Sequence, residues 1–353
     1  MKKFDKSLIA RNVGSSWVSL GTNVVTEIIV SPYILHHIGD EAFGIWVLIF
    51  STTGYYGLFD LGIRSSIVRY VARYTATAEY EELNRLISTA MFSYAAIGLA
   101  AMIVTVIACR YIDSIFRIPT ALVGDSRWLL LMVGGSIAVG FPLGVFSGIL
   151  EGLQKFYLLN LVNILSTTLR AVLIIVALNR GGGLIVIAFI TVLLPLGNSI
   201  VNAVAALRQL KIRVHRKYVD TSTLRLIAGY SSTTLLITVA SRLRFKTDAL
   251  VIGTFVSASA ITYFSIGSRL VEYCAELVGS LAQIFIPMSS QSQAKGDIDG
   301  LRKIFILGNR ACAFIIFPIT AILTFLGKSV IEAWVGPSTS LEAIRYCWCF
   351  SIR

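Results

Sequence analysis

The sequence predicts an all-α membrane protein that crosses the bilayer many times. Of its 353 residues, 56% are hydrophobic and only 14% are charged, whereas an ordinary soluble domain carries about 25% charged residues. Mean hydropathy is +0.77. Apolar runs of about 20 residues, enough for a helix to cross ~30 Å of hydrocarbon, recur between short polar breaks. The alternation typical of β-barrel strands is absent, and a soluble single-core enzyme is excluded because too little charge would cover its surface.

Nine complete helical spans and the start of a tenth are expected. The first follows Lys2, Lys3, Lys6 and Arg11, but it is too long for a signal peptide and no cleavage site follows it. We therefore interpret it as a retained helix. The expected spans are residues 13–36, 43–70, 87–109, 127–150, 157–178, 184–207, 229–252, 260–287 and 304–326, with a tenth from residue 342.

The distribution of basic residues predicts the orientation. With the N-terminus inside, the loops of the predicted cytoplasmic side carry 17 Lys and Arg, and those of the opposite side carry 6. Because cytoplasmic loops are enriched in Lys and Arg, we expect a multi-pass membrane protein with a cytoplasmic N-terminus. The net charge of +12 is thus assigned mainly to membrane loops and not to nucleic-acid binding.

An internal repeat suggests two related lobes. Residues 14–46 match residues 229–263, and later segments keep an offset of 214 to 218 residues. Six expected spans separate the copies, so both would enter the membrane in the same direction, as in parallel-repeat transporters. We expect a six-helix N-terminal lobe over 1–207, a basic cytoplasmic linker over 208–228, and an incomplete C-terminal lobe over 229–353. That last lobe would hold three helices and part of a fourth.

Several short segments resemble one known family in their order and spacing. They are GDEAFGIW (39–46), GLFDLG (57–62), VRYVA (68–72), EGLQKF (151–156) and TDALVIG (247–253). Together they resemble the bacterial polysaccharide and O-antigen-unit flippases, the oligosaccharide flippase family of the multidrug/oligosaccharidyl-lipid/polysaccharide exporter superfamily. The resemblance covers essentially the whole chain. Members normally have twelve or more spans, so the sequence is expected to be C-terminally truncated relative to them.

This resemblance implies a fold and an activity. The fold would be MATE-like, with two six-helix lobes around a central cavity that opens alternately to each side. The activity would be translocation of undecaprenyl-diphosphate-linked oligosaccharides to the outer leaflet for O-antigen, capsule or exopolysaccharide synthesis. A proton or sodium ion would be the counter-substrate. The partners would be the lipid-linked oligosaccharide, the bilayer and polymerase or chain-length proteins of the same pathway.

Ionisable residues at span depth are the candidate site residues. Placing one such charged residue at the centre of a membrane helix costs a free energy of ~2.5–3.5 kcal/mol on insertion scales unless the residue is paired or hydrated. Such residues therefore usually face the interior of a helix bundle. Guanidinium groups suit a diphosphate, and a buried carboxylate can carry a coupling proton. The substrate-binding candidates are Arg170, Arg242 and Arg269, followed by Arg64 and Lys246. The ion-coupling candidates are Glu27, Asp60, Glu272 and Glu276.

Helical spacing groups several candidates into stripes. One stripe joins Asn23 to Glu27, and a second joins Asn160, Asn163, Thr167 and Arg170. A third places Asp60 four residues before Arg64, where the two could pair. Any of these groups could instead form a structural pair that locks helices together, and Arg64 could extend its charged end to the membrane surface. Glycines at 140, 144, 148 and 152 favour close helix packing, within the lobe or between two copies.

Two other functions remain open. A cation-coupled multidrug exporter of the same superfamily would need a more acidic cavity. A membrane glycosyltransferase, polymerase or ligase would need a substantial outer loop, and the longest here, 110–126, has about 17 residues. No hydrolytic triad, metal-ligand pattern or cofactor motif is recognisable. We therefore expect a transporter that is not an enzyme and uses no cofactor.

Overall fold

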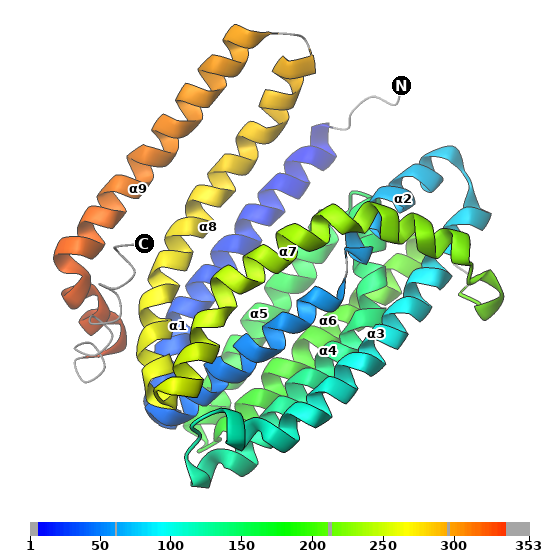
Figure 1. Cartoon of the computed structure of the whole chain (residues 1–353). Coiled ribbons are helices and arrows are strands. Elements are labelled where there is room, and N and C mark those ends of the chain that lie inside the picture. The colour runs from blue at the N-terminus through cyan, green and yellow to red at the C-terminus, as the bar shows by residue number, and fades with distance from the viewer. Residues whose placement is uncertain (1–5, 61, 211–213, 295–296, 337–353) are drawn as a thin grey trace. The chain divides into compact units, whose positions relative to one another are not determined.

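The structure, a computed structural model, describes residues 6–60, 62–210, 214–294 and 297–336. These residues form helices and short connections, and none of them lies in a strand. The chain divides into two compact units, residues 1–261 and 262–353, and each is considered by itself. Figure 1 labels the helices and colours them by residue number. The all-α prediction is confirmed.

The first helix, α1 (Lys6–Gly54), contains the whole first span and part of the second. Gly39 interrupts it with φ 81° and ψ 169°, backbone angles that glycine adopts more easily than other residues. The short 3₁₀ helix η1 (Tyr55–Asp60) follows, and then α2 (Ile63–Thr77) begins after Gly62, which has φ 73°. The expected continuous span 43–70 is therefore broken at 55–62, and the side chains on either side of the break do not share one helical face.

The rest of the first unit consists mainly of long helices. They are α3 (Tyr80–Ile115), α4 (Val123–Gly152), α5 (Phe156–Asn179), α6 (Leu184–Gln209) and α7 (Thr221–Phe255), with the short 3₁₀ helices η2 (Thr120–Leu122) and η3 (Arg216–Tyr218) between them. The start of α8 (Ala258–Ala294) closes this unit, and the remainder of α8 with α9 (Ile298–Val335) lies in the second unit.

Six segments of the described chain are long and apolar enough to cross a membrane. They are Gly14–Asp60, Tyr80–Ile115, Thr120–Gly152, Phe156–Asn179, Leu184–Gln209 and Ile298–Val335. The charged residues of the expected seventh and eighth spans lie on α7 and α8, which are helical over 35 and 37 residues. Each is long enough to cross the hydrocarbon at about 1.5 Å per residue. The chain is a multi-pass membrane protein.

Helix α2 packs against α3, α4 and α7 within the first unit. Its buried face includes Ile67 and Val71, which join a core cluster with residues of α3 and α4. Two glycines of α4 make this approach possible, because a Cβ on Gly152 would lie 2.9 Å from the Val68 carbonyl oxygen and one on Gly148 would lie 3.0 Å from Ile67. Part of the predicted glycine stripe therefore serves packing within the unit.

Candidate functional site

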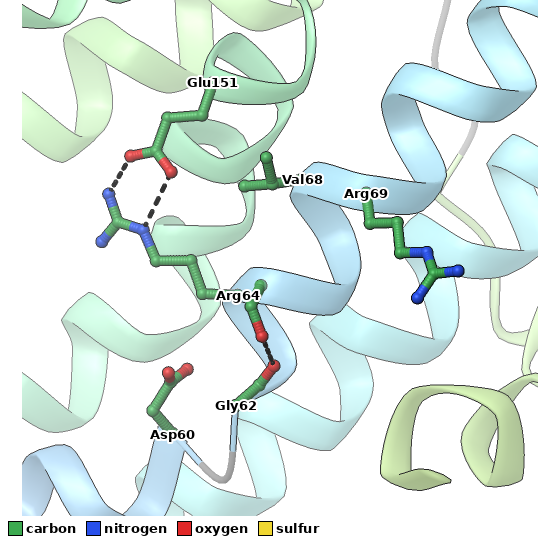
Figure 2. A pocket seen from close by; sticks show the side chains of 7 residues that line it. Asp60, Gly62, Arg64, Val68, Arg69 and Glu151 are labelled. Atoms are coloured by element: carbon green, nitrogen blue, oxygen red, sulfur yellow. Dashed lines mark hydrogen bonds and ion pairs between the residues drawn. The ribbon is translucent and has the colours of Figure 1, made fainter. Parts of the chain in front are cut away.

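An open pocket of about 460 Å³ lies where the start of α2 meets the end of α4. Two arginines and two carboxylates line it, together with three smaller residues: Asp60, Gly62, Arg64, Ser65, Val68, Arg69 and Glu151. Figure 2 shows the Arg64 side chain directed toward Glu151, whereas Arg69 points away from that pair. The pocket thus brings together residues from three of the motifs recognised in the sequence.

Arg64 and Glu151 form the principal ion pair of this pocket. Nη2 of Arg64 lies 2.5 Å from Oε1 of Glu151, and Nε lies 3.4 Å from Oε2. The Arg64 side chain is 51% exposed and that of Glu151 is 20% exposed, so the guanidinium remains accessible from the pocket. Arg64 and Asp60, which the sequence suggested could pair, have different hydrogen-bond partners, Glu151 and Tyr94. The charge of Asp60 nevertheless lies within range of Arg64.

Both members of this pair occupy unfavourable ends of their helices. Arg64 is the second residue of α2, where the helix dipole disfavours a positive charge. Glu151 is the second-last residue of α4, where the dipole disfavours a negative charge. In addition, no side chain caps the N-terminus of α2 at Gly62. The mutual attraction of the two side chains therefore offsets an electrostatic cost that each would bear alone.

Asp60 has a separate partner deeper in the unit. The hydroxyl of Tyr94, a residue of α3 with 3% exposure, donates a hydrogen bond to Oδ1 of Asp60. Nearby on η1, the hydroxyl of Tyr56 is hydrogen-bonded to that of Thr105 at 2.9 Å. The Asp60 carboxylate is thus held by a buried tyrosine and lines the same pocket as the accessible Arg64.

A second polar cluster joins α1 to α5. Asn160 donates to the hydroxyls of Ser15 and Ser16, each at 3.0 Å, and Asn163 donates to that of Ser19 at 2.9 Å. These partners are separated by 144 or 145 residues. The constant separation means that α1 and α5 run in the same direction.

The predicted stripes of α1 and α5 therefore face each other. Thr167 donates to Oδ1 of Asn23 at 3.0 Å, and one step further along, the partly buried Arg170 lies within range of the charge of Glu27. These hydrogen bonds hold α1 against α5, which agrees with the alternative interpretation that the polar stripes lock helices together. Glu27 and Arg170 are the charged residues of this series, and they stay candidate site residues.

The other candidates lie on α7 and α8. Arg269 and Glu272 form an ion pair at 3.3 Å along α8, with side chains 44% and 31% exposed. Glu276, one turn further, is also exposed. The side chains of Arg242 and Lys246 on α7 lie outside the described residues. No cluster able to hold a metal ion occurs among the described residues.

Three functional neighbours were missed as site residues. Tyr94 carries no signal of its own among the apolar residues of α3. Glu151 was noted only within the EGLQKF motif, although its place at the end of a span next to a glycine could have singled it out. Asn12, from α1, binds the turn after α4: its Nδ2 donates to the Gln154 carbonyl at 2.7 Å, and its Oδ1 accepts from the Tyr157 amide at 3.1 Å.

The sequence matches a known protein family and two curated relatives. A family model described as "Polysaccharide biosynthesis protein" matches residues 9–293. The uncharacterized membrane protein EpsK of Bacillus subtilis is 21% identical over 94% of the chain. A Shigella flexneri protein named as an O-antigen transporter is 19% identical over 94% of the chain. The chain spans 66% of the length of EpsK and 78% of that of the Shigella protein.

Solved structures of two kinds of transporter share the fold. An inward-facing multidrug resistance transporter of the MATE family and MOP superfamily gives a TM-score of 0.76 at 15% identity, covering 92% of this chain and 74% of its own. The lipid II flippase MurJ, in an inward closed conformation, gives a TM-score of 0.66 at 15% identity, covering 93% and 69%. At this level of identity the likeness concerns the fold alone, and it confirms the MATE-like fold expected from the sequence.

Proposed function

The chain belongs to the polysaccharide biosynthesis protein family, and on that basis we propose that it works as a flippase for lipid-linked oligosaccharides. The substrate would be an undecaprenyl-diphosphate-linked unit carried from the cytoplasmic to the outer leaflet for surface polysaccharide synthesis. The name of the Shigella relative and the fold shared with a lipid II flippase support this assignment. The protein would act as an ion-coupled alternating-access transporter and not as an enzyme.

The accessible guanidinium of Arg64 is the observation on which the proposal depends. A diphosphate offers oxygens that suit the same two-point contact as the Glu151 carboxylate. In our proposal the substrate diphosphate replaces Glu151 at Arg64. The exchange is favourable because the N-terminus of α2 attracts an anion, and because the Glu151 carboxylate, once released from the guanidinium, can be hydrated in the open pocket.

A coupling ion would be carried by carboxylates close to these arginines. Asp60, held by Tyr94, is the first candidate because it lines the same pocket as Arg64. Glu27 beside Arg170 is the second. In the second unit, Glu272 beside Arg269 and Glu276 one turn away complete the proposed set. Arg242 and Lys246 stay in the proposal as further cations on α7.

A multidrug exporter of the same superfamily is the main alternative. Its fold is compatible with this chain. However, the guanidinium of Arg64 is accessible from the pocket and supplies an anion-binding group that a carrier of drug cations would not need. Arg64 therefore favours an anionic substrate. The proposed location is the cytoplasmic membrane with a cytoplasmic N-terminus, where polymerase and chain-length proteins would receive the flipped unit.

Binding can be tested directly with purified full-length protein. The probe is geranylgeranyl diphosphate, with geranylgeraniol as the uncharged control. We expect the wild-type protein to prefer the diphosphate and Arg64→Gln to bind it at least tenfold more weakly, which corresponds to about 1.4 kcal/mol. Glu151→Gln should bind at least as tightly as wild type, because the competing carboxylate is gone. Arg85→Gln, which removes a surface pair with Glu81 and Glu82, is the matched control.

Cellular export tests the same proposal. Deletion of the full-length gene should leave lipid-linked units on the cytoplasmic side, and complementation with the Arg64→Gln gene should fail. Wild-type export after the deletion, or wild-type binding and export by Arg64→Gln, would refute the assignment. A triple replacement of Arg269, Glu272 and Glu276 by Ala tests the second unit in the same assay, and normal export by that variant would remove these three residues from the site.

A further inference from the structure

Four exposed cations surround the connection between α6 and α7. They are Arg208 at the end of α6, Arg216 and Lys217 in η3, and Arg225 in α7. Within the described part of the chain, none of these four forms an ion pair. The nearby carboxylate of Asp220 is engaged by Ser222 and Thr223. We call residues 214–220, with Arg208 before them and Arg225 after them, the basic strap.

The basic strap is fixed to α3 through its backbone. The amide of His215 donates to Oγ of Ser88 at 3.2 Å, and the amide of Asp220 donates to Oγ1 of Thr89 at 3.2 Å. Both hydroxyl residues are buried, with 0% and 1% exposure. Inside the strap, Nδ1 of His215 accepts from the amide of Lys217 at 3.1 Å. The backbone that carries Arg216 and Lys217 is therefore fixed to α3.

The attachment points place the strap at the level of the membrane surface. The first two turns of α3 carry charged residues, of which Arg85 is the last, and no Asp, Glu, Lys or Arg follows until Arg110. Ser88 and Thr89 thus lie where the apolar stretch of α3 begins. Val214 and Val219 of the strap are 38% and 43% exposed. Aliphatic side chains beside long basic ones suit the boundary between headgroups and acyl chains.

We propose that the basic strap is a binding surface for the headgroups of anionic phospholipids. Clusters of four to eight basic residues next to a membrane-spanning helix attract acidic lipids, and none of the four cations here forms an ion pair within the described residues. The phosphates of phosphatidylglycerol would contact Arg208, Arg216, Lys217 and Arg225 while Val214 and Val219 meet the upper acyl chains. This inference is independent of the proposed transport activity.

Lipid retention by the purified full-length protein provides the test. The protein is equilibrated in mixed micelles with equal amounts of dioleoyl phosphatidylglycerol and dioleoyl phosphatidylcholine, and bound lipids are counted by native mass spectrometry. We expect wild type to retain an excess of phosphatidylglycerol that falls as salt rises. The variant with Arg208, Arg216, Lys217 and Arg225 all replaced by Gln should lose that excess.

Two controls distinguish loss of binding at the basic strap from an effect of the lowered net charge and from misfolding of the variant. A variant with Arg110, Arg117, Arg180 and Arg302 replaced by Gln has the same change in charge and should keep the excess. Arg216→Lys with Lys217→Arg should also keep it, because both charges remain. An excess that survives in the strap variant, or is lost equally in the charge-matched control, would overturn the proposal.

Discussion

Asn12 of α1 binds both sides of the turn that connects α4 and α5. The neighbouring Arg11 lies over the ring of Tyr157, 3.5 Å from its centroid. Gln154 in this turn has φ 59°, a conformation that non-glycine residues seldom adopt. Because Glu151 precedes the same turn, Asn12 helps to keep Glu151 where it meets Arg64.

Replacement of Asn12 by Ala should destabilise this turn. Two hydrogen bonds are lost, at roughly 0.5–1.5 kcal/mol each, so the detergent-solubilised protein should unfold at a lower temperature. Diphosphate binding should also change, because Glu151 is held less firmly against Arg64. Asn309→Ala is the control, since the bond that Asn309 makes within the described residues is to the Phe305 carbonyl of its own helix. Equal melting temperatures for both variants would show that the Asn12 contacts are unimportant.

At the scale of elements, the contact between α2 and α4 depends on the absence of side chains at two glycines. A methyl group on Gly152 would lie 2.9 Å from both the Val68 carbonyl oxygen and Cβ of Val71. By contrast, among the described residues no heavy atom outside the adjoining backbone of α4 lies within 4 Å of a Cβ built on Gly144, two turns earlier. The same helix thus contains a tight glycine and an open one.

Gly152→Ala should therefore cost about 1–3 kcal/mol through overpacking and displace α2 from α4. Gly144→Ala should be neutral or slightly stabilising, because alanine favours the helix. Thermal unfolding of both variants in the same detergent measures the difference. A Gly144→Ala variant as unstable as Gly152→Ala would instead indicate that the open face of α4 contacts a second protein chain.

Helix α7 begins with a pH-dependent cap at Asp220. Hydrogen bonds from the Ser222 hydroxyl, and also from Thr223, hold the pKa of the Asp220 carboxyl below its usual range. The folded-state pKa is lowered, so the stabilisation is present above the unfolded-state pKa of about 3.9. It is lost as the pH falls through the folded-state value.

The first turn of α7 should accordingly loosen in acid. Hydrogen exchange of residues 221–224, corrected for the intrinsic effect of pH, should show less protection below about pH 4 than at pH 7. Asp220→Ala should lack that protection at both values. Asp220→Asn keeps an acceptor for the cap but should show no change with pH. Acid-induced loosening that persists in Asp220→Asn would assign the effect to another group.

For the whole molecule, the sequence was sufficient to predict the all-α class and the family. The class could be predicted because hydropathy reflects burial in the membrane, and the family because motifs such as GLFDLG and EGLQKF are spread along the chain. The family match and the shared fold confirm both predictions. Partners within the site were harder to predict. The stripes of Asn23 and Thr167 were each visible, but helical spacing alone does not say which helices face each other.

The break before α2 is the feature of the fold that differs most from the span predicted over residues 43–70. A helix extrapolated through 55–62 puts Asp60 and Arg64 on one face, whereas the 3₁₀ turn and the left-handed Gly62 separate them. Glu151 then becomes the partner of Arg64 through tertiary contact across 87 residues. The predicted lobe boundaries at 207 and 229 stay predictions.

Side-chain contacts at the two ends of the first unit sharpen the orientation prediction. Asn12 bonds to Gln154, and the Lys155 ammonium donates to Oε1 of Gln209, so the start of α1, the α4–α5 turn and the end of α6 share one end. Further along α1, the hydroxyl of Tyr33 donates to Asn179, next to the 180–183 turn, at 2.5 Å. The basic residues gather at the first end, which the positive-inside rule assigns to the cytoplasm.

Single cysteines introduced into a background with the native cysteines replaced by serine can test this orientation. In intact cells, Lys217→Cys should resist a membrane-impermeant maleimide and react only after permeabilisation, because the basic strap would face the cytoplasm. Arg180→Cys, in the exposed turn between α5 and α6, should react without permeabilisation. The reverse labelling pattern would place the N-terminus outside. The Arg64 pocket includes Glu151 at the end of α4, which lies at the same end of the unit as the start of α1. The reverse pattern would therefore put Arg64 on the outer side, where it could not receive substrate from the cytoplasm, and the proposed direction of transport would have to be inverted.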